Sequence, residues 1–256
     1  MRNKIQTLSF CITCKNRFNQ ISKTLKKNLD DNRLFKDIIE FILVDFGSND
    51  GLFEWIGNNF KEDLQSGYLK YYYTNELQYW HASIAKNTSH LLANNDILVN
   101  LDCDNYTGRY GGRYVIRQFY NCIFPIVMHQ FSGNNMDGSY GRISVEREYF
   151  LKINGYDESF EPMAVQDEDL ILRLHSYGLK YLSCKDGKYN QAIKNTKEEG
   201  LSQTNSSLTY MEMLKKNTEI SEKNIGKGQI IANPDGWGIK NNLFDINEKE
   251  FFFLNT

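Results

Sequence analysis

Short apolar runs alternate with amphipathic segments over the first hundred residues of the chain. Each run is bounded by polar or turn-forming residues, as is typical of a buried strand. The segments between them repeat apolar residues every three or four positions, and Ile21, Leu25 and Leu29 form one such stripe. The pattern predicts strands at residues 7–14, 38–45, 68–74 and 96–101, and helices at residues 17–30, 51–60 and 79–93.

The second half of the chain has a less regular pattern. The same criteria predict strands at residues 122–128 and 180–184, a hairpin arm at 138–145, and helices at 146–153 and 170–177. Residues 185–227 are polar and poor in aliphatic side chains, which is typical either of a mobile lid or of plain surface. The pattern indicates no internal repeat and no second domain.

The order of these elements determines the expected fold. Strands that alternate with helices form parallel βαβ units. We therefore expect a single α/β domain, with a mostly parallel central sheet flanked by helices. In such sheets ligands bind beyond the carboxyl ends of the strands. Those ends direct attention to three segments: Thr13–Arg17, Asp45–Ser48 and Asp102–Asn105.

Composition and charge narrow the class of protein. The 256 residues carry 30 Lys and Arg against 32 Asp and Glu, a net charge of −2, which is not the footprint of a nucleic-acid-binding protein. The longest apolar run, Cys122–Met128, is too short for a transmembrane segment, and the start of the chain does not resemble a signal peptide. Five scattered cysteines suggest reduced thiols. We expect a cytoplasmic protein, with a peripheral position at the inner face of a membrane as the alternative.

Two carboxylates follow the predicted strand at residues 96–101. Asp102 and Asp104 are two positions apart, so their side chains point the same way if the strand geometry continues. Paired carboxylates are costly unless a cation lies between them. Mg²⁺ and Mn²⁺ prefer oxygen ligands, and Mg²⁺ in proteins commonly joins one or two carboxylates to substrate phosphates. The pair predicts a divalent metal site, although a polar turn after a strand would also contain Asp and Asn.

A second acidic cluster opens the helix predicted near residue 170. Gln166 is followed by Asp167, Glu168 and Asp169. Acidic residues stabilise a helix N-terminus through the helix dipole, so the cluster is compatible with simple capping. Three carboxylates exceed what a cap requires, and one of them could act as a general base.

Taken together, these motifs resemble the GT-A glycosyltransferases of family 2, and the later part also resembles the β-1,4-galactosyltransferase catalytic region. The segment Ile42–Gly51 is similar to the family's VDDGSxDG, and Asp102 and Asp104 match its DxD. Ile153–Asp157 with Asp167–Leu170 resembles the acceptor-side NGFD…EDxDL motif. The resemblance covers residues 7–184, with its motifs in the family order.

The resemblance implies roles for individual residues. Asp167 is expected to be the general base, with Glu168 as its rival. Asp102 and Asp104 are expected to hold Mn²⁺ or Mg²⁺. Tyr79, Trp80 and His81 are expected to begin a helix near the acceptor, where aromatic faces suit sugars, with core packing as the alternative role for at least one of them. The donor is expected to contact Thr13, Lys15, Asn16, Arg17, Asp45, Lys86, Asn87, Asp102, Cys103 and Asp104.

Three positions depart from the family pattern. Phe46 stands where the family has the second Asp of VDDGS, which usually contacts the base, so Asp45 or a stacking residue would have to take over that contact. Gln166 replaces the Glu of the ED motif. The late metal-binding His is missing, and Asn195 is the candidate to replace it as a metal ligand.

The expected function is an inverting transfer of a sugar from a nucleotide diphosphate donor, a UDP-sugar in the first instance, to a hydroxyl of a glycan or peptide. Residues 1–105 would bind the nucleotide, 106–184 the acceptor, and 185–256 would form a lid and tail. A sugar-phosphate nucleotidyltransferase is an alternative, although the turn at Thr13–Arg17 lacks the glycines such enzymes use. The second alternative is a catalytically inactive module that binds nucleotide sugars.

Overall fold

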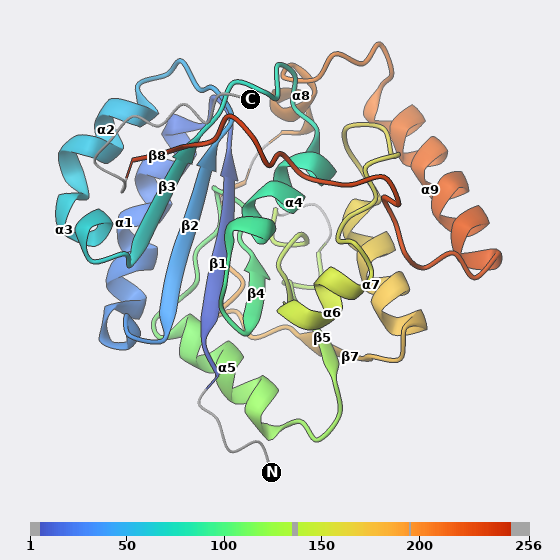
Figure 1. The fold of residues 1–256 in the computed structure, drawn as a ribbon, viewed down its shortest axis with the longest axis horizontal. Helices are drawn as coiled ribbons and strands as arrows, with labels where there is room; N and C mark the ends of the chain where they lie inside the picture. Colours follow the sequence, from blue (N-terminus) through green and yellow to red (C-terminus); the bar gives the residue numbers. More distant parts are fainter. Residues whose placement is uncertain (1–5, 135–137, 195, 247–256) are drawn as a thin grey trace.

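The computed structural model describes residues 6–134, 138–194 and 196–246 of the chain (Figure 1). Within these ranges, eight strands form one sheet in the order β7-β5-β6-β4-β1-β2-β3-β8. Strands β6 and β8 run antiparallel to their neighbours, and the remaining neighbours are parallel. The strands are β1 Leu8–Cys14, β2 Ile39–Asp45, β3 Leu69–Tyr73, β4 Ile97–Asn100, β5 Ile126–Gln130, β6 Ile143–Glu146, β7 Lys180–Cys184 and β8 Phe244–Asp245.

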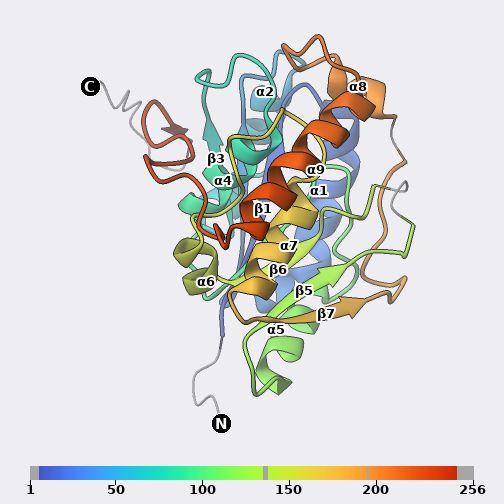
Figure 2. The ribbon, with the colours of Figure 1, turned by 90° about the vertical axis from the view of Figure 1, so that its right-hand side faces the viewer.

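Helices cover both faces of this sheet, as the side view in Figure 2 shows. The longest of them, α9, packs outside α7 rather than directly on the sheet. The helices are α1 Phe18–Asn32, α2 Leu52–Asn59, α3 Lys61–Gln65, α4 Ala82–Leu92, α5 Gly111–Asn121, α6 Arg147–Lys152, α7 Gln166–Ser176, α8 Lys197–Leu201 and α9 Tyr210–Gly226, with a short 3-10 turn η1 at Arg33–Phe35.

Two apolar cores explain why the central strands are continuous apolar runs. In β1, Phe10 and Ile12 face the core formed with α1 and α5, whereas Cys11 faces the core formed with α4, α6 and α7. Every residue of β1 is buried. A strand covered on both faces needs apolar side chains at successive positions rather than alternate ones. The structure confirms the expected α/β domain with a mostly parallel sheet flanked by helices.

Several boundaries differ from those expected. Helix α4 begins at Ala82, so residues 79–81 precede it, and α7 begins at Gln166. Strand β5 occupies residues 126–130 instead of 122–128. The polar stretch at 185–227 contains α8 and α9, and the pattern did not indicate α5. In the described part of the chain, no helix combines the length and the apolar character needed to cross a membrane.

Candidate functional site

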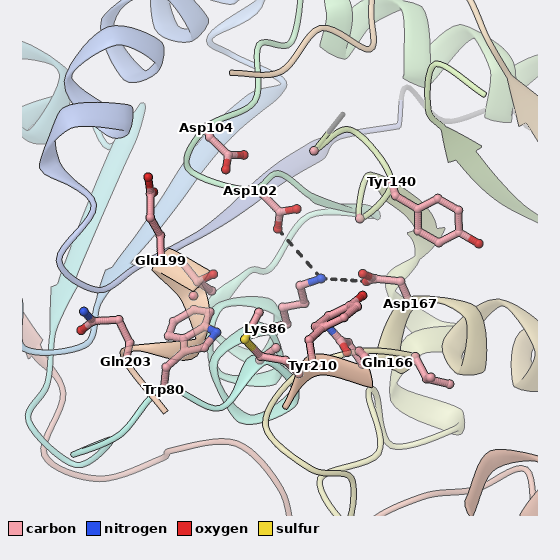
Figure 3. Close-up of a pocket in the computed structure, with 18 of the residues that line it drawn as sticks. Trp80, Lys86, Asp102, Asp104, Tyr140, Gln166, Asp167, Glu199, Gln203 and Tyr210 are labelled. Atoms are coloured by element: carbon pink, nitrogen blue, oxygen red, sulfur yellow. Dashed lines mark hydrogen bonds and ion pairs between the residues drawn. The ribbon is translucent and has the colours of Figure 1, made fainter. Parts of the chain in front are cut away.

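A cavity of about 520 Å³ opens at the carboxyl edge of the central strands (Figure 3). Its size falls within the range of about 300–1,000 Å³ typical of small-ligand sites. Its walls come from the β1–α1 turn, the loop after β4, the start of α7 and the segment around α8 and α9. The sequence-predicted residues that line it are Thr13, Lys15, Arg17, Lys86, Asp102, Cys103, Asp104, Asp167 and Glu168.

The loop after β4 carries both carboxylates of the DxD motif. Asp102 Oδ1 accepts a hydrogen bond from Asn100 Nδ2 at 3.0 Å. Asp104 accepts one from Asn105 Nδ2 at 2.6 Å and lies 3.4 Å from Arg17. Burial, reinforced by the charge of Asp102, raises the pKa of Asp104 to about 6. The two carboxylates of the loop are thus close enough for the charge of one to affect the other.

Lys86 projects from α4 into the centre of the site. Its Nζ lies 2.7 Å from Asp167 Oδ1 and 3.9 Å from Asp102 Oδ1, as the dashed lines in Figure 3 show. Burial opposes the charged form, but the carboxylates of Asp167 and Asp102 outweigh it and raise the pKa of Lys86. A single ammonium group thus connects the DxD loop to the acidic start of α7.

The first turn of α7 supplies Asp167 and Glu168. Burial, then the charge of Asp167, raises the pKa of Glu168, and the Tyr140 hydroxyl lowers it by a smaller amount. The two residues before the helix, Ala164 and Val165, have φ of 75° and 70° and also line the cavity. Positive φ is rare for a β-branched residue, and such strain is concentrated at functional sites.

Helix α9 holds this strained turn in place. Asn217 is completely buried, and its Nδ2 donates to the carbonyls of Met163 and Ala164 at 2.8 and 2.9 Å. Ser221 donates to Asp169 Oδ1 at 2.7 Å. These contacts offset the cost of the unusual backbone with buried hydrogen bonds.

Three residues expected at the donor do not line this cavity. Asp45 is completely buried, accepting hydrogen bonds from Tyr71 Oη at 2.6 Å and from the Ser48 N–H at 2.8 Å. Asn87 is buried too, and it bonds to both the N–H and the carbonyl of Tyr156. Asn16 instead binds Gln203 and the N–H of Asn49. In the structure these three side chains stabilise turns around the site through their hydrogen bonds.

The remaining expectations have mixed outcomes. Asn195 lies outside the described residues. Phe46 is completely buried, and its ring meets that of Trp80 edge-on, with 6.1 Å between centroids. Trp80 lines the cavity on the side of Glu199 and Gln203, whereas Tyr140 and Asp167 lie on the other side (Figure 3). Tyr79 lines a neighbouring cavity instead.

The structure also adds residues that the sequence did not indicate. Gly141 lines the cavity, and a Cβ built on it would lie 2.6 Å from Asp102 Oδ2 and 3.3 Å from Lys86 Nζ. Nothing in the local sequence distinguishes this glycine from a turn glycine. Glu199, Gln203 and Tyr210 come from the polar stretch at 185–227, whose helices the apolar pattern did not reveal.

The described residues contain no cluster of three or more His, Cys, Asp or Glu suited to a metal. What the chain offers is the carboxylate pair of Asp102 and Asp104. Carboxylate oxygens are ligands that suit Mg²⁺ or Mn²⁺. In their chemistry, these two side chains fit a divalent ion.

Comparisons with known proteins place the fold. No family model and no curated protein matches the sequence. The mannosyltransferase PcManGT from Pyrobaculum calidifontis, in complex with GDP-Man and Mn²⁺, matches with a TM-score of 0.60 and 14% identity. The match covers 75% of this chain and 57% of the mannosyltransferase, so the chain spans little more than half its length.

A second solved structure gives the same result. S. aureus TarS 1-349 in complex with UDP-GlcNAc matches with a TM-score of 0.60 and 12% identity, covering 90% of this chain and 74% of that one. At sequence identities this low, the similarity shows the fold alone. The chain has the α/β architecture of GT-A glycosyltransferases.

Proposed function

We propose that the protein is a metal-dependent glycosyltransferase. It would move a sugar from a nucleotide diphosphate donor, with UDP-sugars the first candidates, to a hydroxyl of a glycan or peptide. One observation carries the proposal: Asp102, Asp104, Lys86 and Asp167 converge in one cavity at the carboxyl edge of a parallel sheet. The neighbours in complex with GDP-Man and UDP-GlcNAc support the choice of donor class.

The donor diphosphate would lie beside the DxD loop. Asp104 and Asp102 would hold the divalent ion, which when bound neutralises charge on the departing nucleotide diphosphate. Arg17, 3.4 Å from Asp104, adds a fixed positive charge on the same side. The protein thereby places positive charge where negative charge develops, which is commonly the largest contribution to catalysis.

The acceptor would enter between the donor and α7. Asp167 would take the proton of the attacking hydroxyl while Lys86 holds its Oδ1 at 2.7 Å, leaving Oδ2 for the acceptor. Attack opposite the leaving diphosphate inverts the anomeric carbon. Glu168, half-buried and next to it in sequence, is the rival for this role.

Nucleotide binding and transfer test the proposal separately. We expect calorimetry to detect UDP or GDP binding that requires Mn²⁺, and mass spectrometry of UDP-sugar mixtures to detect Mn²⁺-dependent loss of the sugar. Asp104→Asn keeps the side-chain shape and should abolish the metal-dependent part of the affinity. Asp186→Asn on a loop outside the cavity is the matched control.

The two measurements also separate the alternatives. Metal-dependent binding without any turnover of nucleotide sugars would indicate a binding module. Formation of a nucleotide sugar from a sugar phosphate and a nucleoside triphosphate would indicate a nucleotidyltransferase. Unchanged affinity in Asp104→Asn would remove the DxD loop from the site.

A further inference from the structure

The donor end of the cavity contains an aromatic platform. We propose that Trp80 binds the nucleobase of the donor by stacking, in place of the carboxylate that contacts the base in related GT-A enzymes. The inference rests on the proposed function and names how one part of the donor is recognised. It starts from the position of Trp80 in the wall of the cavity.

Trp80 is held firmly although it lies in a loop. Its ring packs edge-on against the buried ring of Phe46, at an interplanar angle of 80°. Its backbone N–H donates to the carbonyl of Gln203 at 2.7 Å. Lys15 Nζ donates to the carbonyls of Phe46 and Leu77, which connects the loop to the β2–α2 turn. A platform fixed before binding costs little conformational entropy when the ligand arrives.

The arrangement of the cavity assigns Trp80 to the base. Trp80 lies on the side of Glu199 and Gln203, and Asp167 lies on the opposite side (Figure 3). A donor with its diphosphate at Asp104 and its sugar toward Asp167 would extend its nucleoside away from Asp167, to the side of the cavity where Trp80 lies. If Trp80 contacted the sugar instead, the donor would have to bind in the reverse orientation. Its nucleobase would then lie at Asp167, the proposed general base.

Carboxylates near this end already have partners. Asp45 is buried with Tyr71 and Ser48, as described above. Glu199 lies 3.6 Å from Arg17 and accepts a hydrogen bond from Gln20. Phe46, at the position where the resembling family has an acid, supports the Trp80 ring instead. Recognition by the aromatic face replaces recognition by a charged acceptor.

Inorganic pyrophosphate provides the decisive probe because it has the diphosphate but no base. Calorimetry on the full chain with Mn²⁺ would compare UDP, GDP and pyrophosphate. Stacking contributes about 1–3 kcal/mol per base, so Trp80→Ala should weaken nucleotide binding about 5- to 150-fold and leave pyrophosphate affinity unchanged. Trp80→Phe should recover most of the loss. Tyr79→Ala should cause none, because Tyr79 lines the neighbouring cavity that Trp80 also borders but does not line the proposed donor cavity.

Each other outcome overturns the inference in a distinct way. Unchanged nucleotide affinity in Trp80→Ala would place the base elsewhere while leaving the proposed function intact. An equal loss for pyrophosphate would make Trp80 a support for the loop and not a platform. If the unaltered protein binds neither nucleotides nor pyrophosphate, the proposed function and this inference both fail.

Discussion

Lys86 connects the two acidic groups on which the proposed chemistry depends. Its ammonium lies within 4 Å of carboxylates from two distant parts of the chain, Asp102 and Asp167. A buried lysine keeps its charge only when such partners offset the cost of desolvation. Because Oδ1 of Asp167 is held by Lys86, the carboxylate has a fixed orientation before any acceptor binds. That orientation is what a general base requires.

The identity of the base can be tested by paired substitutions. We expect Asp167→Asn to bind UDP and Mn²⁺ normally and to slow transfer about 10²- to 10⁴-fold, the usual cost of losing general base catalysis. Glu168→Gln should cost much less. A transfer assay on both variants decides the matter. If the Glu168 substitution costs more of the transfer rate than the Asp167 substitution, Glu168 is the general base. If both variants lose little activity, the acidic cluster serves only as a helix cap.

Gly141 should tolerate no side chain. A Cβ there would lie 2.6 Å from Asp102 Oδ2 and 3.3 Å from Asp167 Oδ2, so both carboxylates would have to move. Misplacing reacting groups by about 1 Å can cost on the order of 100-fold in rate. We predict at least a tenfold loss of transfer in Gly141→Ala with little change in melting temperature. Gly187→Ala, at an exposed position with open space around it, is the control.

At the scale of elements, α4 is unusual because polar residues are buried along it. His90 is 2% exposed, with its Nδ1 2.6 Å from the carbonyl of Lys86 and its ring stacked on Phe150. Burial lowers the pKa of His90 to about 3, from 6.5. Between these values the unfolded chain binds a proton that the folded protein does not, so stability falls as the pH falls below 6.5.

This difference in the pKa of His90 between the folded and unfolded chain predicts a measurable pH dependence of the free energy of unfolding. His90 should remove about 1.4 kcal/mol of stability per pH unit between pH 6 and pH 4. Urea unfolding of the parent and of His90→Gln at several pH values should show a shallower dependence in the variant. His175→Gln, at an exposed position, controls for the substitution itself. Parallel curves for the parent and His90→Gln would contradict the prediction.

Apolar periodicity was sufficient for the strand–helix order of the first half, because those elements pack directly on the sheet. It failed for α9, whose buried positions are Met213, Asn217 and Ser221. Their spacing is helical, yet two of the three are polar: Asn217 bonds to the turn before α7, and Ser221 bonds to Asp169 within α7. The capping box of Thr209 and Glu212 was a readable sign of the helix start.

The sequence also located the site better than it assigned individual residues. Asp102 and Asp104 lie at the carboxyl edge of the sheet because they follow β4, a position that the βα order predicts. Asp167, in the first turn of α7, is joined to Asp102 through Lys86, a contact that this order does not predict. Asp45 at the end of β2 and Asn87 on α4 are buried, and position in the sequence does not reveal which way a side chain points. Gly141 could not be found, since its importance is the absence of a side chain beside groups distant in sequence.

At the scale of the whole molecule, the segment around α8 connects the late chain to the β1–α1 turn. Glu199 contacts Arg17 and Gln20, and Gln203 binds Asn16. A diphosphate that binds Arg17 would compete with Glu199, so we predict that α8 moves when donor binds, as expected of a lid. Gln203, whose carbonyl accepts from the Trp80 N–H, should stay in place.

Hydrogen exchange with and without UDP and Mn²⁺ measures this prediction. Protection should change in peptides covering α8, Lys197–Leu201, and should stay constant in α5, which lies outside the cavity wall. Limited proteolysis gives an independent readout. If exchange changes only at the DxD loop, the segment is a fixed wall and the lid assignment is wrong.

The sheet order has a consequence for synthesis of the protein. The parallel block β4-β1-β2-β3 is made first, but its outer strands pair with β6 and β8, which come later in the chain. Until Phe244 and Asp245 leave the ribosome, β3 has an open hydrogen-bonding edge. Open edges are templates for pairing with other chains. The yield of folded protein should therefore depend on translation speed and on chaperones that shield the nascent chain.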